Sequence, residues 1–495
     1  MSLNPGRLLN ERVKEHPHKI ALITKSEKLD FLSLNHRANR LAHVLSAAGI
    51  KYNARVAILL PNSSEFVVAY LAVQKIGGVA IPLDMKLLQR DIEEILDFTG
   101  SSMLITLPSL EIFASPTCPL VTLEKEQIRF QGEILTPPDA DIGLDRAPDD
   151  EATYLSTSGS TGRSKLAILT FENLSCFPQV LREIYATSSE EVYGILLPMS
   201  HVSGPIAIQE LVEHGTTIVI FDLLSERRTI LQSIVENKIS LIWAVAPMYR
   251  LLIQEAKMRG GGTRSLRVLA VMGMETPLDF MQEMARVFPG TAIVQGYGLT
   301  ETAGVVIGTP PSEAMRKMKS VGHPAKFMEI ATVDAEGKSL PPLAQGQIVM
   351  RGKAVMKGYY RDEAATRERI KDDWLYTGDV GYFDEEGYLY LLGRKDDMII
   401  TGGLNVFPAE VEDVLRRHPK IKDVAVVGMP DPMRGEVVKA VVVPAAPITK
   451  EEILRFCRSN LPAFKCPRKV ELQEELPSTS TGKTIRNALR LTEES

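Results

Sequence analysis

The stretch Ser156-Thr157-Ser158-Gly159-Ser160-Thr161-Gly162-Arg163-Ser164-Lys165 is rich in hydroxyl side chains and also holds two glycines and two cations. It follows an acidic segment that contains prolines. Glycine lets backbone N–H groups approach an anion closely, and hydroxyl and cationic side chains donate further hydrogen bonds to phosphate oxygens. The stretch therefore predicts a loop that holds the polyphosphate of a nucleotide.

The spacing within this loop is not that of a P-loop ATPase, which requires Gly-x-x-x-x-Gly-Lys-Ser/Thr. A second run, from Pro477 to Thr484, comes nearer, but Pro477 stands where the first glycine is required. For either run taken alone, a flexible Ser/Gly loop is an equal alternative. Other segments of the chain must therefore decide between the two interpretations.

Length and composition are those of an ordinary globular protein. A chain of 495 residues predicts two or three domains, and a net charge of −5 argues against nucleic-acid binding. The four cysteines form no C-x-x-C pair, so neither a disulfide framework nor a zinc site is expected. No apolar run is long enough for a transmembrane segment, and no apolar leader begins the chain. We expect a cytoplasmic protein.

The first third of the chain alternates strands and helices. Residues 56–60 and 79–81 predict buried strands, and apolar positions at helical spacing predict a helix between them. Asn62, with Glu65 three residues later, is the expected cap of that helix. Residues 136–150 hold prolines and several aspartates, and we expect them to form a surface linker between subdomains.

A second α/β stretch follows, and then the pattern changes to short strands and turns. Strand–helix alternation predicts a parallel sheet with strands at 217–221, 241–245, 267–272 and 291–295. Ligands of such sheets bind beyond the carboxyl ends of the strands, where Gly273 and Gly296 stand. After residue 346 the strands are short. The last hundred residues predict a compact unit with helices from Pro408 and Lys450 and strands near Val424 and Val438.

Three further motifs carry candidate chemistry. In Gln295-Gly296-Tyr297-Gly298-Leu299-Thr300-Glu301, Tyr297 can stack on a purine, Thr300 can donate to a phosphate, and Glu301 can hold Mg²⁺, which usually takes one or two carboxylates beside phosphate oxygens. The alternative is a strand-to-helix turn with Glu301 in a first helical turn.

In the run 374–379, Asp379 suits the two hydroxyls of a ribose. In 393–403, Gly402-Gly403 follows a charge run and suggests a hinge and a close approach of backbone to ligand, although a solvated β-turn is the alternative.

Together and in this order, these segments resemble the adenylate-forming superfamily, which contains acyl- and aryl-CoA synthetases, luciferases and nonribosomal-peptide adenylation domains. The resemblance spans nearly the whole chain and is strongest to fatty-acid–CoA ligases. Further matching segments lie at 197–201, 320–324, 351–352 and 356–359. It implies an α/β protein with two doubly wound subdomains and a small β-rich subdomain in a large N-terminal AMP-binding domain, 1–395. A small mobile α+β domain, 396–495, would carry the catalytic lysine, with Asp396 as the hinge.

The resemblance also implies ATP, Mg²⁺ and coenzyme A as cofactors, each held by matching residues. The implied catalytic residues are Lys483, Thr300, Glu301 and His201, with Glu301 also the metal ligand. The implied phosphate contacts are Thr157, Ser158, Gly159, Ser160, Thr161, Gly162 and Lys165. The implied adenine contacts are Gly273, Met274, Glu275, Gln295, Gly296, Tyr297 and Gly298. The implied ribose contacts are Asp379 and Arg394, and Gly402 and Gly403 would border the tunnel for the thiol acceptor.

The function implied is an ATP-dependent acid–thiol ligase. It would convert a carboxylic acid to acyl-AMP with release of pyrophosphate and then transfer the acyl group to coenzyme A. A stand-alone adenylating protein that loads a carrier protein remains the alternative, and a P-loop kinase or ATPase is disfavoured. The small-molecule acid and coenzyme A are the expected partners, and a homodimer is left open.

The identity of the acid is the least determined part. His201 replaces the aspartate of amino-acid-adenylating members, so an α-amino acid is not expected; His201 could gate the pocket, meet the carboxylate, or simply pack after a strand. The pocket candidates are mostly apolar and favour a fatty or aryl acid: Val202, Gly204, Ile206, Trp243, Val245 and Gly304. Arg250 and Arg264 leave a dicarboxylic acid open. Three basic residues fit coenzyme A phosphates or, alternatively, a solvated surface: Arg434, Lys439 and Lys465.

Overall fold

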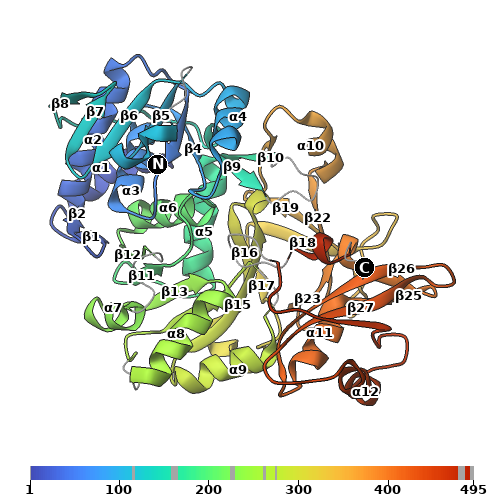
Figure 1. Cartoon of the computed structure of the whole chain (residues 1–495). Coiled ribbons are helices and arrows are strands. Elements are labelled where there is room, and N and C mark those ends of the chain that lie inside the picture. The colour runs from blue at the N-terminus through green and yellow to red at the C-terminus, as the bar shows by residue number, and fades with distance from the viewer. Residues whose placement is uncertain are drawn as a thin grey trace. The chain divides into compact units, whose positions relative to one another are not determined.

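The computed structural model describes residues 2–113, 118–157, 165–222, 229–259, 263–273, 276–477 and 485–490 (Figure 1). The chain divides into two compact units. Unit 1 comprises Met1–Gly273, Met281–Glu329 and Arg351–Leu375, and unit 2 comprises Met274–Phe280, Ile330–Met350 and Tyr376–Ser495. Among the described residues, no helix combines the length and the apolar character needed to cross a bilayer.

The helices of both units are mostly two to four turns long. Their bounds are α1 Pro5–Glu15, α2 Phe31–Ala47, α3 Ser64–Lys75, α4 Gln89–Thr99, α5 Phe171–Glu183, α6 Ser203–His214, α7 Ile230–Glu236, α8 Ala246–Arg259, α9 Leu278–Val287, α10 Glu363–Arg369, α11 Pro408–Arg416, α12 Lys450–Asn460 and α13 Arg486–Arg490.

Unit 1 contains two nine-stranded sheets. The first has the order β20-β10-β9-β4-β3-β5-β6-β7-β8, with bounds β3 Arg55–Leu59, β4 Val79–Pro82, β5 Met103–Thr106, β6 Leu120–Glu124, β7 Gln127–Phe130, β8 Glu133–Leu135, β9 Glu151–Thr157, β10 Lys165–Thr170 and β20 Gly358–Tyr359. The second has the order β17-β16-β15-β14-β13-β11-β12-β1-β2, with bounds β1 Ile20–Ile23, β2 Lys28–Asp30, β11 Val192–Ile195, β12 Thr217–Ile220, β13 Leu241–Ala244, β14 Val268–Val271, β15 Ala292–Leu299, β16 Gly304–Gly308 and β17 His323–Pro324.

The central strands of both sheets are parallel and largely buried. Every residue of β4, β13 and β14 is buried, which is the pattern of parallel strands covered on both faces. The α/β fold class and the strands expected at 217–221, 241–245, 267–272 and 291–295 are confirmed as β12, β13, β14 and the start of β15. Two features were not expected. The antiparallel hairpin β9–β10 belongs to the first sheet, and β1 pairs with β12 at Leu22 and Ile218.

The helix between β3 and β4 begins one residue later than its expected cap. Ser63, not Asn62, is the N-cap of α3, because its hydroxyl accepts a hydrogen bond from the N–H of Phe66 at 3.3 Å. The proposed pairing of Asn62 with Glu65 is therefore wrong as a capping box. The Asn62 side chain is instead used in long-range hydrogen bonds, described below.

Residues 136–150 lie outside any helix or strand, as expected of a linker, but they are tied down. The amide of Asn39 on α2 donates to the carbonyl of Asp139 at 3.0 Å and to the carboxylate of Asp141 at 3.1 Å. Lys75 of α3, whose side chain is fully buried, donates to the carbonyl of Ile142 at 3.2 Å. The linker is thus strapped onto the helices of unit 1 because its backbone carbonyls satisfy buried donors.

Unit 2 contains the strands that precede the C-terminal hundred residues and the sheet that those residues form. The first group is β18 Met328–Val333, β19 Gly346–Gly352, β22 Trp374–Phe383 and β23 Leu389–Arg394. The ends of three of these strands, at 328–329, 351–352 and 374–375, belong to unit 1, as does β21 Ile370–Lys371, which pairs with the start of β22. The second sheet has the order β25-β24-β27-β26 with β28 on β27, and its bounds are β24 Ile399–Thr401, β25 Leu404–Val406, β26 Ile421–Asp431, β27 Gly435–Pro444 and β28 Lys469–Leu472.

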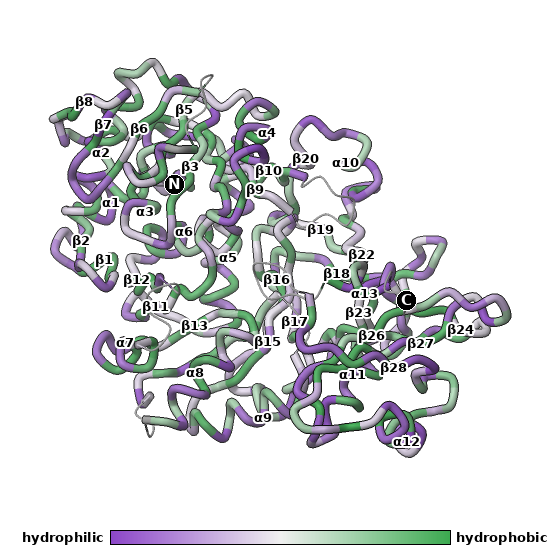
Figure 2. Tube along the Cα trace, viewed as in Figure 1, coloured by the Kyte–Doolittle hydropathy of each residue, from purple (hydrophilic) through white to green (hydrophobic). Residues whose placement is uncertain are grey.

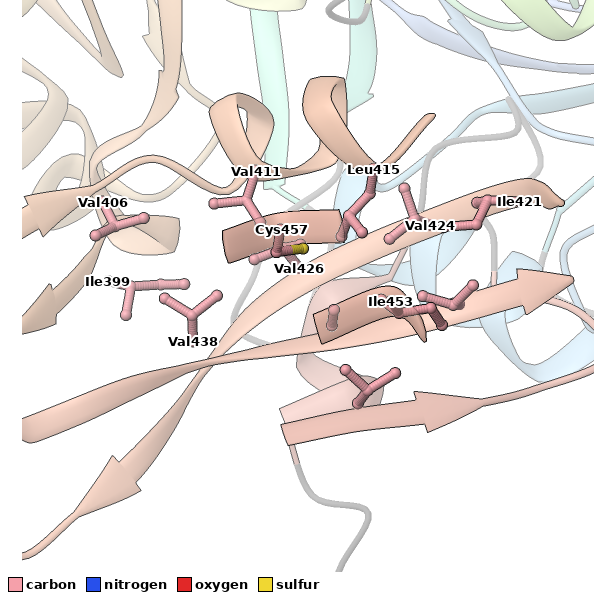
Figure 3. Packing of buried hydrophobic residues seen from close by; sticks show 13 residues of the cluster. Ile399, Val406, Val411, Leu415, Ile421, Val424, Val426, Val438, Ile453 and Cys457 are labelled. Atoms are coloured by element: carbon pink, nitrogen blue, oxygen red, sulfur yellow. The ribbon is translucent and has the colours of Figure 1, made fainter. Parts of the chain in front are cut away.

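The core of this second sheet follows the period of two that strands impose on side chains. Val424 and Val426 of β26 pack with Val411 and Leu415 of α11 and with Cys457 of α12 on one face (Figure 3). Most residues of α12 are hydrophilic, whereas β27 is largely hydrophobic (Figure 2). The helices and strands expected in this region are confirmed. The domain boundary expected at Lys395–Asp396 stays a prediction.

Candidate active site

The described residues of the opening stretch lie on two paired strands of unit 1. Strands β9 and β10 pair so that Thr157 lies opposite Lys165, and the Thr157 hydroxyl donates to the carbonyl of Lys165 at 3.3 Å. Ser158, Gly159, Ser160, Thr161 and Gly162 lie outside the described residues. The two described members of the predicted phosphate loop therefore stand at its base, where β-pairing holds them together.

Lys165 lies next to a tyrosine to which the sequence assigned no role. The Lys165 ammonium is 5.2 Å from the ring centroid of Tyr359, within range of a cation–π contact. Tyr359 is on β20, which pairs with β10 and so brings this ring beside the loop base. Tyr359 is 7% exposed. Its segment, 356–359, was recognised in the sequence, but nothing there indicated which neighbour its hydroxyl would meet.

That neighbour is Glu301, the residue predicted to hold the metal. The Tyr359 hydroxyl donates to Glu301 Oε1 at 2.8 Å, and the Glu301 carbonyl accepts from the N–H of Met356 at 2.8 Å. Burial, and secondarily the adjacent carboxylate, raises the pKa of Tyr359 well above its ordinary value, so the tyrosine remains a donor at neutral pH. Thr300 and Glu301 form the short 3-10 turn that follows β15.

The described residues contain no group of three or more His, Cys, Asp and Glu side chains arranged to hold a metal. Glu301 offers a single carboxylate, which suits Mg²⁺ when phosphate oxygens and water molecules supply the other ligands. The donor set is therefore that of a metal that arrives with a nucleotide. It does not fit a metal held by protein ligands alone.

The glycines of the 295–301 segment have a packing reason of their own. At residue 298 a Cβ atom would overlap the carbonyl of Gly304, and at residue 296 it would lie 3.1 Å from the hydroxyl of Tyr185. The Gln295 amide donates to the carbonyl of Met318 at 2.9 Å. Gln295 and Tyr297 are both buried. The close approach of β15 and β16 thus explains these glycines before any ligand is considered.

Gly273 closes β14 with a φ of 78°, and a Cβ atom there would lie 3.5 Å from Val245. The two other predicted adenine contacts, Met274 and Glu275, lie outside the described residues. Gly304 has a φ of 95°, and a Cβ atom there would lie 3.0 Å from Ile206 and 3.9 Å from Val202. Gly273 and Val245 therefore form one small apolar group, and Gly304, Ile206 and Val202 form a second.

Two other pocket candidates are explained by packing. Gly204, the second residue of α6, lies directly against the preceding backbone, since a Cβ atom there would overlap the carbonyl of Met199. Trp243 is 1% exposed and lies between the rings of Phe177 and Tyr193, at centroid distances of 5.2 and 5.0 Å. Both residues are therefore packed within the core of unit 1.

His201 is paired with an acid that the sequence did not single out. His201 Nε2 lies 3.3 Å from Asp84 Oδ2. The hydrogen bond with His201 is the main cause that holds the pKa of Asp84 below its usual value. Asp84 follows β4 and also accepts from the N–H of Lys86 at 2.9 Å. The two side chains are 32% and 21% exposed, although the Nε2 atom itself is buried.

Asn62 fixes the segment that leads to His201. Its side-chain amide donates to the carbonyls of Leu197, at 2.9 Å, and Phe221, at 3.2 Å, and its Oδ1 accepts from the N–H of Met199 at 2.8 Å. Both of its N–H groups and its oxygen are thus bonded to backbone groups that follow β11 and β12 of the other nine-stranded sheet. These partners lie far away in the sequence, so the sequence could not reveal them.

The predicted ribose contacts come together in unit 2. Asp379 of β22 is the register partner of Arg394 on β23. Arg394 Nη1 donates to Asp379 Oδ1 at 3.2 Å and to the carbonyl of Thr377 at 3.2 Å. The Asp379 carboxylate is one-eighth exposed and the guanidinium one-third exposed. An acid and a base fifteen residues apart in sequence therefore form one polar pair at a strand end.

Gly402 and Gly403 form the two-residue turn between β24 and β25, where Thr401 pairs with Leu404. Their φ values are 58° and 81°, and a Cβ atom on either would meet nothing within 4 Å. A tight hairpin turn of this kind requires positive φ at both positions. The turn accounts for both glycines, and their role beside a ligand stays a prediction. Lys483 lies outside the described residues.

The basic residues considered for coenzyme A differ in their surroundings. Lys439 is 1% exposed, and its ammonium contacts Glu471 Oε2 at 2.7 Å and the carbonyl of Leu489 at 3.2 Å. The interpretation of Lys439 as a phosphate contact is therefore wrong, because this ammonium is buried and neutralised within the fold. Lys465 is paired with Glu410 at 2.8 Å, and Arg434 is exposed.

Two protein-family models match this chain, one over its N-terminal part and one over its C-terminal part. The model of a family described as AMP-binding enzyme matches residues 9–360, and that of the AMP-binding enzyme C-terminal domain matches residues 410–483. A feruloyl-CoA synthase from an Amycolatopsis species is 34% identical over 487 residues, covering 97% of both chains. A 2-succinylbenzoate–CoA ligase from Bacillus licheniformis is 32% identical, covering 99% of this chain and all of the relative.

Solved structures give the same result. The o-succinylbenzoate CoA synthetase (MenE) from Bacillus subtilis, in complex with the acyl-adenylate intermediate OSB-AMP, superimposes with a TM-score of 0.88 at 30% identity, covering 99% of this chain and 98% of that one. The complex of MenE with ATP and magnesium ion gives a TM-score of 0.87 at 31% identity, covering 97% and 98%.

Proposed function

The chain belongs to the AMP-binding enzyme family, and we propose that it is an ATP-dependent CoA ligase for a carboxylic acid that carries an aromatic ring. The observation that carries this proposal is the chain of contacts from Lys165 through Tyr359 to Glu301. It joins the base of the predicted phosphate loop to the predicted metal ligand within unit 1. The relatives named as CoA synthase and CoA ligase support the reaction class.

The first half-reaction joins two anions, the acid's carboxylate and the α-phosphate of ATP. The carboxylate oxygen attacks the α-phosphorus, and pyrophosphate leaves. Lys165 would hold the leaving phosphates and Thr300 would donate to the α-phosphate, because fixed donors stabilise charge that develops in the transition state. Mg²⁺, held by Glu301 and phosphate oxygens, supplies further charge neutralisation when bound. The MenE complex with ATP and magnesium ion supports these cofactors.

Three further residues complete this step in the proposal: Lys483, which lies outside the described part, and the pair Asp379 and Arg394. Lys483 would bridge the carboxylate and α-phosphate oxygens as a point charge. The Asp379–Arg394 pair would present its carboxylate to the ribose hydroxyls, with Arg394 fixing its orientation. Both assignments rest on matching family motifs and remain proposals.

In the second half-reaction the thiolate of coenzyme A attacks the acyl carbonyl, and AMP leaves. A thiol must approach the carbonyl by a route that the catalytic lysine occupied, so Lys483 has to withdraw. We assign that movement to two domains, 1–395 and 396–495, that turn about Asp396. The relatives are named for coenzyme A, so the carrier-protein alternative finds no support among them.

The acid class follows from the wall of the candidate pocket. Val202, Ile206 and Gly304 form one apolar group, and Trp243 of β13 packs against the rings of Phe177 and Tyr193. His201 stands where amino-acid-adenylating enzymes place an aspartate, so no partner for a substrate ammonium is present at that position. An aromatic acid fits these surfaces, and feruloyl and succinylbenzoate are the acyl groups named for two relatives. A fatty acid is the second candidate, on the same apolar lining.

A screen of pyrophosphate release tests this proposal. The full chain is incubated with ATP, Mg²⁺ and one acid at a time, with and without coenzyme A: ferulate, 2-succinylbenzoate, and straight-chain fatty acids of several lengths. We expect an aromatic acid to give the highest rate and AMP release to require coenzyme A. A preference for fatty acids would reject the acid class, and an equal response to every acid would reject the reaction class. In the same assay, Lys483→Ala should lower adenylation about a hundredfold.

The surroundings of the protein in the cell follow from the same proposal. Its four cysteines are free thiols, three of them buried, as in proteins of a reducing compartment. Burial raises the pKa of the Cys118 thiol to about 11 and of the Cys457 thiol to about 12, so neither is reactive at neutral pH. We place the enzyme in the cytoplasm. A homodimer stays a prediction.

A further inference from the structure

A short segment of unit 1, residues 353–359, meets Glu301 at both its backbone and its side chain. The N–H of Met356 donates to the Glu301 carbonyl at 2.8 Å, and the Tyr359 hydroxyl donates to Glu301 Oε1 at 2.8 Å. Met356 and Glu301 are both buried. The segment therefore helps to determine where the Glu301 carboxylate lies, and a contact that fixes the segment also acts on Glu301.

The two halves of this segment are held in different ways. The second half is held by a strand, because β20 pairs with β10 and the N–H of Lys357 donates to the carbonyl of Ile168 at 3.0 Å. The first half, 353–356, belongs to no helix or strand. Its backbone carbonyls therefore need partners outside regular secondary structure.

Asn173, the third residue of α5, supplies these partners. Its Nδ2 donates to the carbonyl of Lys353 at 2.7 Å and to that of Val355 at 3.1 Å. Its Oδ1 accepts from the N–H of Thr170 at 2.8 Å, in the capping box that begins α5. Asn173 is 5% exposed. The two ends of its side chain thus have separate partners: the oxygen caps the helix, and the nitrogen holds the segment.

We propose that Asn173 is a positioning residue that fixes Glu301, through the backbone of residues 353–356, in the orientation that binds Mg²⁺. The inference rests on the proposed function, in which Glu301 is the metal ligand. The Val355 carbonyl, which accepts from Asn173, and the Met356 N–H, which donates to Glu301, belong to one peptide unit. Because a peptide unit is planar, a donor that fixes its carbonyl also fixes the direction of its N–H.

Three variants separate this role from the capping of α5. Asn173→Asp keeps the oxygen that caps the helix and removes both N–H donors. Asn173→Ala removes the oxygen and the donors without adding a charge. Thr170→Val is the matched control: it removes the hydroxyl that accepts from the N–H of Asn173 at 3.2 Å and leaves the amide of Asn173 in place.

The first measurement is hydrogen–deuterium exchange of the full chain without ligand, read at the amides of residues 355–357, each of which donates to a backbone carbonyl. Loss of the two bonds from Asn173 predicts about tenfold faster exchange in Asn173→Asp and Asn173→Ala and no change in Thr170→Val. Rates equal to those of wild type would overturn the proposal. Faster exchange in Asn173→Asp alone would come from the added charge, and an equal acceleration in Thr170→Val would come from the helix start; either result would also overturn it.

The second measurement is the affinity of the full chain for ATP by calorimetry, with Mg²⁺ and with EDTA. We expect Mg²⁺ to strengthen ATP binding in wild type, and both Asn173 variants to reduce this gain about three- to tenfold, at or below the range for a direct partner of a metal ligand. Affinity in EDTA should stay the same. Tyr359→Phe combined with Asn173→Ala should reduce the gain by less than the product of the single effects, since both act on one carboxylate. An unchanged gain in the Asn173 variants, or single effects that multiply fully, would overturn the proposal.

The two proposals fail in distinguishable ways. If Mg²⁺ does not strengthen ATP binding in wild type, the proposed function fails, and amide exchange alone decides whether Asn173 fixes the peptide unit at Glu301. If Mg²⁺ strengthens ATP binding equally in wild type and in both Asn173 variants, the assignment of Asn173 fails and the ligase stands.

Discussion

The hydroxyl of Tyr359 donates to Glu301 Oε1 at 2.8 Å, and both side chains are 7% exposed. The bond is formed because β20, two residues long, pairs with β10 at the base of the predicted phosphate loop. It leaves a buried carboxylate oriented by one donor. A donor that fixes the orientation of a metal ligand contributes substantially to the affinity for the metal.

Tyr359→Phe removes this donor and keeps the ring. The Glu301 carboxylate then stays buried without its partner, which costs about 1–3 kcal/mol. We expect the Mg²⁺ concentration for half-maximal adenylation to rise about tenfold, the low end for the loss of a ligand's supporting hydrogen bond. The measurement is ATP–pyrophosphate exchange against Mg²⁺ concentration. Tyr360→Phe is the control, and an equal Mg²⁺ requirement in wild type and Tyr359→Phe would disprove the role.

Asn62→Ala should loosen the segment that carries His201. It removes three hydrogen bonds to Leu197, Met199 and Phe221, and we expect unfolding to become easier by about 2 kcal/mol and the KM for the acid to rise. Ser63→Ala, one residue later, is the matched control. It removes the N-cap of α3 at a cost of about 1 kcal/mol and should leave the acid KM alone. A proportional KM change in both variants would argue for general destabilisation.

Asp84→Asn tests the ion pair with His201. Asp84 lies 3.3 Å from His201 Nε2 and helps to fix the orientation of the ring, so loss of the carboxylate should misplace the ring and weaken binding of the acid. We expect an increase in acid KM of about five- to tenfold, since the pair is partly exposed and worth about 1 kcal/mol, with a smaller change in kcat. Initial rates over a range of acid concentrations at pH 6 and pH 8 measure this. A KM that does not move at either pH would separate the pair from acid binding.

The sequence was informative wherever a segment's own pattern decided its structure. Buried runs such as 241–245 and the helix start at Pro408 were predicted correctly because hydrophobic period and a proline at N1 are local signals. That Thr157 and Lys165 would be register partners on two antiparallel strands was not predicted, and the phosphate-loop role of this stretch stays a prediction. Pairing depends on partners elsewhere, as when β1 joins β12 almost two hundred residues away.

The misassigned side chains share a cause. Lys439 was considered for a ligand and is instead buried against Glu471, and Asn62 was assigned to a cap and instead spans two loops. A polar residue at a strand or helix end has several partners available, and only the assembled fold selects one. Tyr359 was overlooked for the same reason, since its importance arises from Glu301, which lies fifty-eight residues earlier.

Lys75 predicts a specific pH dependence of stability. Burial is the main cause that lowers its pKa from 10.5 to about 7, so between pH 7 and 10.5 the unfolded chain binds more protons than the folded one. Stability from this group therefore rises with pH across that window and is lowest below pH 7. We expect the unfolding free energy of wild type minus that of Lys75→Met to increase by about 2 kcal/mol from pH 7 to pH 9. Urea unfolding at both pH values measures it, and a constant difference would contradict it.

Gly402→Asn tests whether Gly402 serves only the β24–β25 turn or also borders the proposed tunnel for the thiol. Asparagine tolerates positive φ, and nothing lies within 4 Å of a Cβ atom at this position, so the loss of stability should be under about 1 kcal/mol. Gly132, in the β7–β8 turn, has a φ of 88° and equally open surroundings, and Gly132→Asn is the matched control. If Gly402 borders the path of the thiol, consumption of preformed acyl-AMP by coenzyme A should fall severalfold in Gly402→Asn alone, while ATP–pyrophosphate exchange stays at the wild-type rate. Equal thioester rates in the two variants would mean that Gly402 serves the turn and nothing more.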